Sequence, residues 1–87
     1  MDKIVLDGNA MRTREDAHRE LMEKLSFPAH YGKNLDALFD CVSTAKAEVW
    51  LINAHALSEI PGNYGRKLID TLSDAARING DFAFHIA

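Results

Sequence analysis

Apolar positions along this chain fall into short blocks whose spacing predicts three β-strands. Residues 3–6 consist of a lysine and three apolar residues, two of them β-branched, and end at an Asp-Gly turn signal. Residues 48–53 form a second apolar run with a polar residue at each end. The second run is typical of a strand covered on both faces, which would place Trp50 in the core. Residues 82–86 alternate phenylalanine or isoleucine with other side chains and predict the third strand, with both phenylalanines in the core.

Helical spacing separates the first two runs. Thr13, followed three residues later by Asp16, resembles a capping box, and apolar residues then recur every four positions as far as Leu25. This first helix is expected to stop before the Phe-Pro pair, because the residue before a proline disfavours helical backbone. Asn34 is a favourable N-cap for a second helix over residues 34–44.

The segment between the second and third runs also carries helical signals. A short helical turn is predicted around residues 56–60 and is ended by a Pro-Gly pair. A longer helix is predicted to start at or near Asn63 and to end at an Asn79-Gly80 C-cap. The apolar stripe of this helix would face the core through Leu68, Ile69, Leu72, Ala75 and Ala76.

The predicted order is β-α-α-β-(α)-α-β, in which every connection between strands is long enough for a crossover. Parallel strands need such crossovers, and these are right-handed in nearly all proteins. We therefore expect an α/β protein with one small domain over residues 1–87, in which a three-stranded parallel sheet is packed with helices. The length of 87 residues is compatible with one domain.

Charge and cysteine content limit the function classes. Ten Lys and Arg against thirteen Asp and Glu give a formal net charge of −3, which disfavours nucleic acid as a direct ligand and leaves a basic protein partner open. The single Cys41 excludes an internal disulfide. The N-terminal apolar stretch is too short for a signal peptide, and no apolar run approaches the ~20 residues of a membrane span. We expect a cytoplasmic, monomeric protein without a cofactor or membrane contact.

The second predicted helix carries an acidic pair beside its apolar sector. Asp36 and Asp40 are four residues apart, and like charges at this spacing destabilise a helix by about 0.2–0.5 kcal/mol. Asp36 lies in the first turn, where the helix dipole favours an anion. Asp40 lies in the second half, and no Lys or Arg is placed three or four residues away. The pattern fits either a solvated acidic face or carboxylates that meet cations on a partner.

The segment from Pro28 to Cys41 resembles the central signature of the barstar family, named for the intracellular inhibitor of the extracellular ribonuclease barnase. The resemblance is carried by a long and nearly gapless run, Tyr31-Gly32-Lys33-Asn34-Leu35-Asp36-Ala37-Leu38-Phe39-Asp40-Cys41. Weaker similarity covers the opening strand, the first helix, the end of the long helix and the last strand. The resemblance agrees with the predicted α/β fold and favours the interpretation of the acidic pair as a partner-binding feature.

The resemblance implies a stoichiometric inhibitor and not an enzyme. In the family, the second helix and the loop before it enter the active site of a ribonuclease, where an aspartate takes the place of a substrate phosphate. Asp40 corresponds to that aspartate, Asp36 to a supporting carboxylate, and Asp74 to a further acidic contact on the last helix. The implied partner-binding residues are His30, Tyr31, Gly32, Asn34, Asp36, Phe39, Asp40, Ser43 and Asp74.

The sequence departs from the family pattern around this implied site. His30 replaces a tyrosine, Phe39 is smaller than the usual tryptophan, and Asp74 is one methylene shorter than glutamate. Ala45 belongs to a Ser-Thr-Ala segment where the best-known member has a Gly-Trp pair. The expected partner is therefore a basic microbial ribonuclease, either barnase-like or a related toxin domain.

Two other function classes remain open at this point. A domain of this fold could bind a cytoplasmic protein that is not a nuclease. An enzyme would need a metal site, an acid–base pair or a Cys-His nucleophile. The chain has no zinc-ligand spacing, and two carboxylates on adjacent turns of an exposed helix offer no cleft. The candidate residues for a nucleophile or a metal site are Cys41, His18, His30, His55 and His85.

Overall fold

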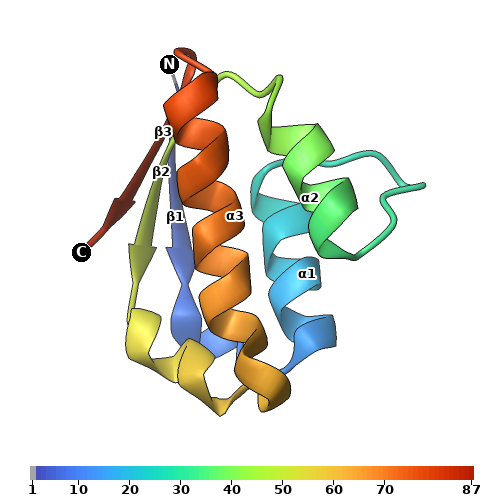
Figure 1. Ribbon diagram of the computed structural model, residues 1–87, viewed down its shortest axis with the longest axis vertical. Helices are drawn as coiled ribbons and strands as arrows, with labels where there is room; N and C mark the ends of the chain where they lie inside the picture. The colour runs from blue at the N-terminus through green and yellow to red at the C-terminus, as the bar shows by residue number, and fades with distance from the viewer. Residues whose placement is uncertain (1) are drawn as a thin grey trace.

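A computed structural model describes residues 2–87 of the chain (Figure 1). Within these residues one sheet contains the strands β1 (Asp2–Asp7), β2 (Ala47–Ile52) and β3 (Phe82–Ile86). The α-helices are α1 (Arg14–Lys24), α2 (Leu35–Val42) and α3 (Tyr64–Ile78). Short 3-10 helices occupy η1 (Gly8–Ala10), η2 (Ala54–Glu59) and η3 (Pro61–Asn63).

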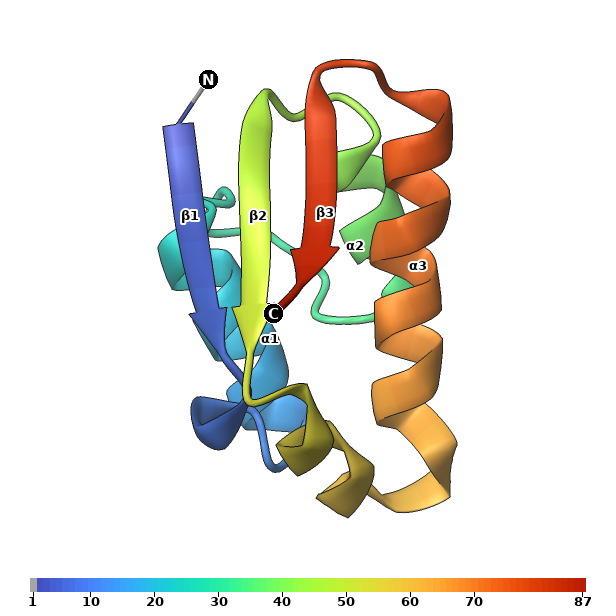
Figure 2. The same ribbon diagram turned by 90° about the vertical axis from the view of Figure 1, so that its left-hand side faces the viewer.

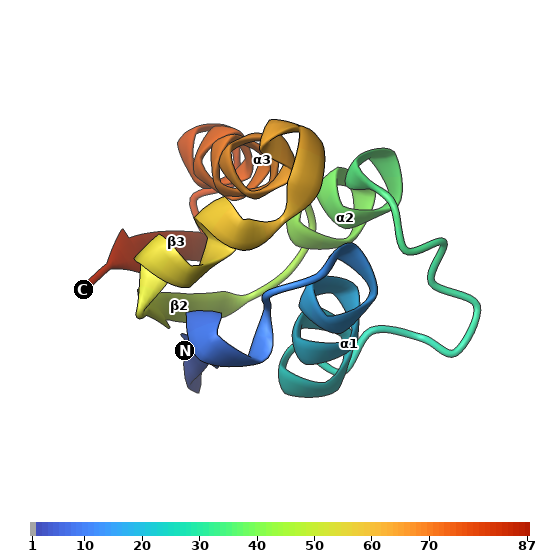
Figure 3. The ribbon, with the colours of Figure 1, turned by 90° about the horizontal axis from the view of Figure 1, so that it is seen from below.

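The sheet is parallel and has the order β1-β2-β3, so β2 is its central strand. Leu6 of β1 pairs with Leu51 of β2, and Val49 of β2 pairs with Phe84 of β3. The three α-helices lie on the same side of the sheet (Figure 2), as the view along the strands also indicates (Figure 3). The predicted α/β fold with three parallel strands packed with helices is confirmed.

Burial alternates strictly along the central strand. The side chains of Ala47, Val49 and Leu51 are buried, whereas those between them are only partly buried. Successive side chains of a strand point to opposite faces, so only the face that carries these three residues is sealed by helices. The prediction of a central strand covered on both faces is wrong, because the apolar run of β2 continues through positions that face away from the helices.

Trp50 lies on the uncovered face of the sheet and not in the core as predicted. Its indole stacks on His85, with ring centroids 4.3 Å apart, and the ammonium group of Lys3 lies 5.1 Å from its ring centroid. The indole Nε1 donates a hydrogen bond of 2.9 Å to Glu48 Oε2. Polar side chains of the same sheet therefore shield a large aromatic residue that has no helix over it.

The ends of α1 and the start of α3 follow the sequence signals. Thr13 Oγ1 accepts a hydrogen bond of 3.1 Å from the main-chain N–H of Asp16, and α1 ends at Lys24, before the Phe-Pro pair. Asn63 precedes α3 in the left-handed region with φ of 60°, and its side chain makes no capping bond. Asparagine tolerates this backbone conformation better than most residues, which accounts for its place at the turn into α3.

The end of α3 differs from the predicted Asn-Gly cap. Asn79 has φ of −115° and ψ of 103°, so it does not adopt the left-handed conformation of that motif. Its side-chain amide instead donates to the main-chain oxygens of Val42 at 3.0 Å and Ala45 at 2.9 Å, and its Oδ1 accepts from the N–H of Asp81. Asn79 therefore joins the end of α3 to the segment that follows α2.

Candidate functional site

α2 and the loop before it lie at the edge of the molecule away from β3 (Figure 3). Asn34 caps the start of α2, because its Oδ1 accepts a hydrogen bond of 2.7 Å from the N–H of Ala37. The apolar residues of this helix pack on the core as predicted, two of them fully buried and two partly buried. These residues are Leu38 and Val42, then Leu35 and Phe39.

The other side of α2 exposes two carboxylates. Asp36 and Asp40 are both exposed, and no ion pair within residues 2–87 involves either of them. The hydroxyl of Ser43 donates to the main-chain oxygen of Asp40 at 2.9 Å and so does not neutralise its side chain. The two charges are therefore available to cations outside the described chain.

The loop between α1 and α2 presents His30 and Gly32 to solvent. Tyr31, between them, is only 6% exposed, and its hydroxyl lies 2.7 Å from Nδ1 of His18. The ring of Tyr31 also packs against Phe27, with centroids 4.8 Å apart. Tyr31 therefore supports the loop from inside, and only a small part of its side chain is exposed.

A hollow of about 230 Å³ lies between this loop and α2. It brings together four of the nine predicted site residues, with Asp40 at one side and the loop at the other. Its lining consists of Pro28, His30, Tyr31, Gly32, Ala37, Asp40 and Cys41. The remaining predicted residues do not line the hollow, although Asn34, Asp36, Phe39 and Ser43 belong to α2 or its immediate ends.

Asp74 stands apart from this group. It is exposed on α3, and its carboxylate forms an ion pair with Arg77 on the next turn. A partner cation would compete with Arg77 for this carboxylate, whereas no cation within residues 2–87 forms an ion pair with Asp40.

The structure gives no support to chemistry at Cys41. Burial first, and then the negative charge of Asp40, raise the pKa of the Cys41 thiol. The thiolate is the nucleophilic form, so this environment disfavours the reactive form of the sulfur. Among residues 2–87, no group of three His, Cys, Asp or Glu side chains is arranged to hold a metal ion.

His18 was not recognised from the sequence as part of this region. It is 1% exposed, and its Nε2 lies 2.6 Å from the hydroxyl of Tyr64, opposite the contact of Nδ1 with Tyr31. Burial, with smaller effects of Arg14 and Lys33, lowers the pKa of His18 from 6.5 to about 4. The imidazole is therefore neutral at pH 7. The sequence offers one signal of this burial, because His18 directly follows Ala17, which belongs to the apolar face of the first helix.

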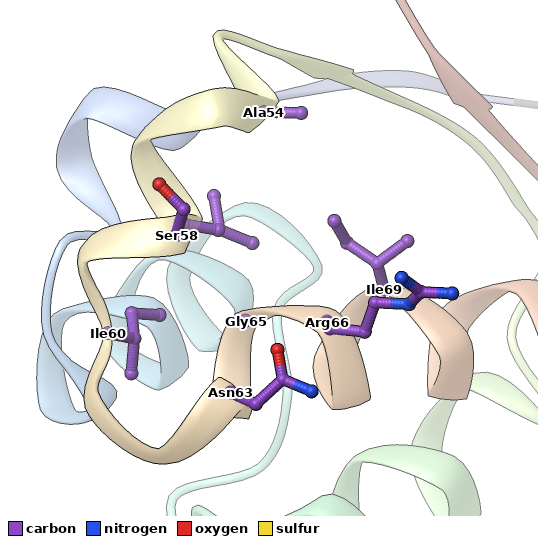
Figure 4. Close-up of a pocket in the computed structure, with 8 residues that line it drawn as sticks. Ala54, Ser58, Ile60, Asn63, Gly65, Arg66 and Ile69 are labelled. Atoms are coloured by element: carbon purple, nitrogen blue, oxygen red, sulfur yellow. The ribbon is translucent and has the colours of Figure 1, made fainter.

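A second hollow, of about 270 Å³, lies between η2 and the start of α3 (Figure 4). Gly65 permits the close approach of these two elements, since a Cβ at this position would lie 2.3 Å from the main-chain oxygen of Leu57. The side chains of Ser58, Asn63 and Arg66 supply polar groups at its edge. This hollow shares no residue with the predicted site.

Within residues 2–87, this small α/β protein exposes two unpaired carboxylates on α2, next to a loop that Tyr31 supports from inside. Residues 1–86 match the family described as Barstar (barnase inhibitor), and the chain belongs to this family. It is also 33% identical over 78 residues to a Bacillus subtilis (strain 168) protein named "Putative ribonuclease inhibitor YrdF", with 86% of each chain covered.

These comparisons confirm the resemblance inferred from the segment between Pro28 and Cys41. They also assign the chain to a family of inhibitors and not to a family of enzymes, as expected. Separately, none of the helices in the described part of the chain has the length and apolar character needed to span a membrane.

Proposed function

We propose that this protein inhibits a microbial ribonuclease by covering its active site, one molecule to one enzyme, with α2 and the loop before it. Membership of the barstar family and the similarity to a protein named as a ribonuclease inhibitor support this proposal. The observation that carries the mechanism is the position of Asp40, which is exposed, unpaired and at the side of a hollow.

The chemistry of a ribonuclease explains why such a carboxylate would bind there. An enzyme that cleaves RNA concentrates Arg, Lys and His side chains around a phosphate. A carboxylate can accept charge-assisted hydrogen bonds from the same groups, including bidentate bonds from Arg. Asp40 would occupy the place of the phosphate, and Asp36 would add a second charge one turn earlier on α2.

The other predicted residues have supporting roles in this proposal. His30 and Gly32 would line the contact from the loop, and Phe39 would add apolar contact beside the carboxylates. Asn34 would hold the start of α2 through its capping bond. Ser43 would contribute at the end of the helix and Asp74 at the rim, after exchange of its bond to Arg77 for one to the partner.

Residues around the proposed contact differ from those usual in the barstar family, and these differences bear on the identity of the partner. His30, Phe39, Ala45 and Asp74 all offer less apolar area or reach than the residues usual in the family. We propose that the cognate enzyme is a basic ribonuclease, or a toxin domain of related fold, whose surface around the active site differs from that of barnase. The inhibitor itself would act in the cytoplasm as a monomer.

An RNA-cleavage titration tests this function. A fluorogenic RNA substrate is cleaved by a fixed amount of enzyme while the inhibitor is added in steps. The enzymes are barnase and the toxin-like product of any adjacent reading frame. We expect activity with one of them to fall linearly to zero at a one-to-one ratio. Capture of a partner without nuclease activity, together with no protection of RNA from either enzyme, would instead indicate an interaction module of the same fold.

A further inference from the structure

The loop that carries His30 and Gly32 is held by very few groups. Of the residues 26–34, only Tyr31 is buried, and Phe27 is partly buried. Ser26 and Lys33, near the two ends, have positive φ values of 55° and 54°. Such left-handed backbone costs roughly 1–2 kcal/mol for a residue with a side chain. The loop therefore keeps its shape only because other contacts outweigh this cost.

Tyr31 makes the deepest contacts of this loop, and Phe27 packs against the core beside it. Its main-chain N–H donates to Pro28 O at 2.9 Å, which closes the turn, and its ring enters the core. At the inner end of the ring, the hydroxyl meets Nδ1 of His18 at 2.7 Å. The single buried ring of the loop is thus anchored to one nitrogen of a buried histidine on α1.

The second nitrogen of His18 is also occupied. Nε2 lies 2.6 Å from the hydroxyl of Tyr64, the first residue of α3, and the guanidinium of Arg14 lies 4.5 Å from the ring centroid of Tyr64. A neutral imidazole has one donor and one acceptor, so one tyrosine hydroxyl must donate to it and the other must accept from it. The imidazole therefore joins α1, the loop and α3 in a single ordered chain of hydrogen bonds.

We propose that His18 is a positioning residue for partner recognition, because through the Tyr31 hydroxyl it fixes the loop that faces Asp40 across the hollow. This inference rests on the proposed function, and it extends the site inward to His18, which is 1% exposed. The loop and Asp40 line the same hollow of about 230 Å³. A loop that samples other conformations would present this hollow only part of the time, and affinity falls in proportion to the competent fraction.

Two tyrosine-to-phenylalanine substitutions form a matched test. Tyr31→Phe and Tyr64→Phe each remove one hydroxyl from the same imidazole, at residues that are 6% and 8% exposed. Both variants lose a buried hydrogen bond, so both should lose stability. Only Tyr31→Phe releases the loop. We expect its affinity for barnase, or for the enzyme inhibited in the titration above, to fall about threefold to tenfold, the equivalent of one net hydrogen bond.

The loss of affinity can arise from slower association or from faster dissociation, and this difference distinguishes a positioning role from general destabilisation. In Tyr31→Phe the association rate constant should carry most of the loss, because fewer molecules have the competent loop. Tyr64→Phe should bind within about twofold of wild type under conditions in which both variants remain folded. Equal losses of affinity in the two variants, or no loss in either, would overturn the proposal.

Amide hydrogen exchange in the free protein gives a readout that needs no partner. We expect faster exchange at residues 29–33 in Tyr31→Phe and wild-type exchange at these residues in Tyr64→Phe. Unchanged exchange in Tyr31→Phe would refute the positioning role even if the protein is a ribonuclease inhibitor. Failure of the wild type to inhibit any ribonuclease would count against the proposed function, and the exchange data would still decide whether His18 holds the loop.

Discussion

Asp40 is exposed to solvent at a position where its charge does not stabilise the helix. It lies in the second half of α2, one turn after Asp36, and no ion pair within residues 2–87 includes it. Replacement by asparagine removes the repulsion between like charges four residues apart. We therefore expect the free energy of unfolding of Asp40→Asn to equal or slightly exceed that of the wild type.

The same substitution should weaken the complex with the target ribonuclease. If Asp40 meets target cations in a dehydrated contact, Asp40→Asn should weaken binding by about 3–5 kcal/mol, mostly through faster dissociation. Asp36→Asn should cost less. Surface plasmon resonance and urea unfolding of the same samples measure both effects. Glu23→Gln, which removes a charge from the exposed surface of α1, is the matched control and should bind as the wild type does. Wild-type affinity of Asp40→Asn would refute its role as a phosphate mimic.

The buried imidazole of His18 makes stability depend on pH in a defined window. Burial, followed by Arg14 and Lys33, lowers its pKa from 6.5 to about 4, so the unfolded chain takes up this proton at a higher pH than the folded protein does. Stability should therefore fall as the pH is lowered from about 6.5 to about 4, by about 3 kcal/mol in total. Below about pH 4 this contribution no longer changes.

Urea unfolding between pH 7 and pH 4 tests this effect by comparing the wild type with His18→Gln. The variant should be less stable at pH 7 but should show a flatter pH profile over the window. Acid sensitivity below pH 4 should remain in both proteins. One source of this remaining acid sensitivity is Asp7, whose pKa is lowered mainly by the hydrogen bond from Asn53. The stability that this carboxylate contributes is lost as the pH falls and the group becomes protonated. Parallel profiles would mean that His18 does not titrate as inferred.

At the scale of elements, the end of α2 is held by a residue that lies 37 positions later in the chain. Asn79 donates to the oxygen of Val42, which also accepts a longer bond of 3.4 Å from the N–H of Ala45, and to the oxygen of Ala45, three residues beyond the end of α2. Asn79→Ala should lower the free energy of unfolding by about 1–3 kcal/mol, because it removes both side-chain hydrogen bonds between α3 and this segment.

Asn79→Asp sharpens this prediction. It keeps the oxygen that accepts from Asp81 but loses both donors and places a carboxylate against two carbonyl oxygens. It should therefore be at least as destabilised as Asn79→Ala in chemical unfolding. If Asn79→Asp is as stable as the wild type, the two bonds to the α2 segment contribute nothing to holding it.

The elements differ in how far local sequence determines them. α2 was predictable because its cap, its apolar sector and its acidic pair all lie within ten consecutive residues, and the family signature covers the same segment. The parallel order of the strands followed from the length of the connections. The role of Asn79 could not be predicted, because its partners lie on another element and a local Asn-Gly motif pointed to a different cap.

Burial on a single face of the sheet was missed for a related reason. The apolar run of β2 looks the same whether helices cover one face or two, and Trp50 is shielded by Lys3, Glu48 and His85, which come from all three strands. The hydrogen bonds of His18 likewise join three separate parts of the chain. Contacts that depend on such distant partners become visible only when the fold is known.

For the whole molecule, the distribution of charge predicts how it meets a partner. The chain carries a formal net charge of −3, and α2 adds two unpaired carboxylates at the contact face. Raising the salt concentration from 25 mM to 500 mM should slow association with a basic ribonuclease by about tenfold or more, because exposed charges are screened beyond the Debye length. Dissociation should change much less. Stopped-flow mixing measures both rate constants. An association rate constant that does not change with salt would show that electrostatic steering does not contribute to binding.

The location of Trp50 provides a natural optical reporter of the folded state. It is the sole tryptophan of the sequence, and it belongs to the sheet face turned away from the helices, so a molecule docked on α2 leaves it uncovered. Its indole stacks against His85, which pairs with it across β2 and β3. Loss of the sheet separates these rings, whereas binding at the helical side leaves them together. We therefore expect the fluorescence of this indole to change on unfolding and to stay constant during recognition, which would separate the two events in one sample without an added label.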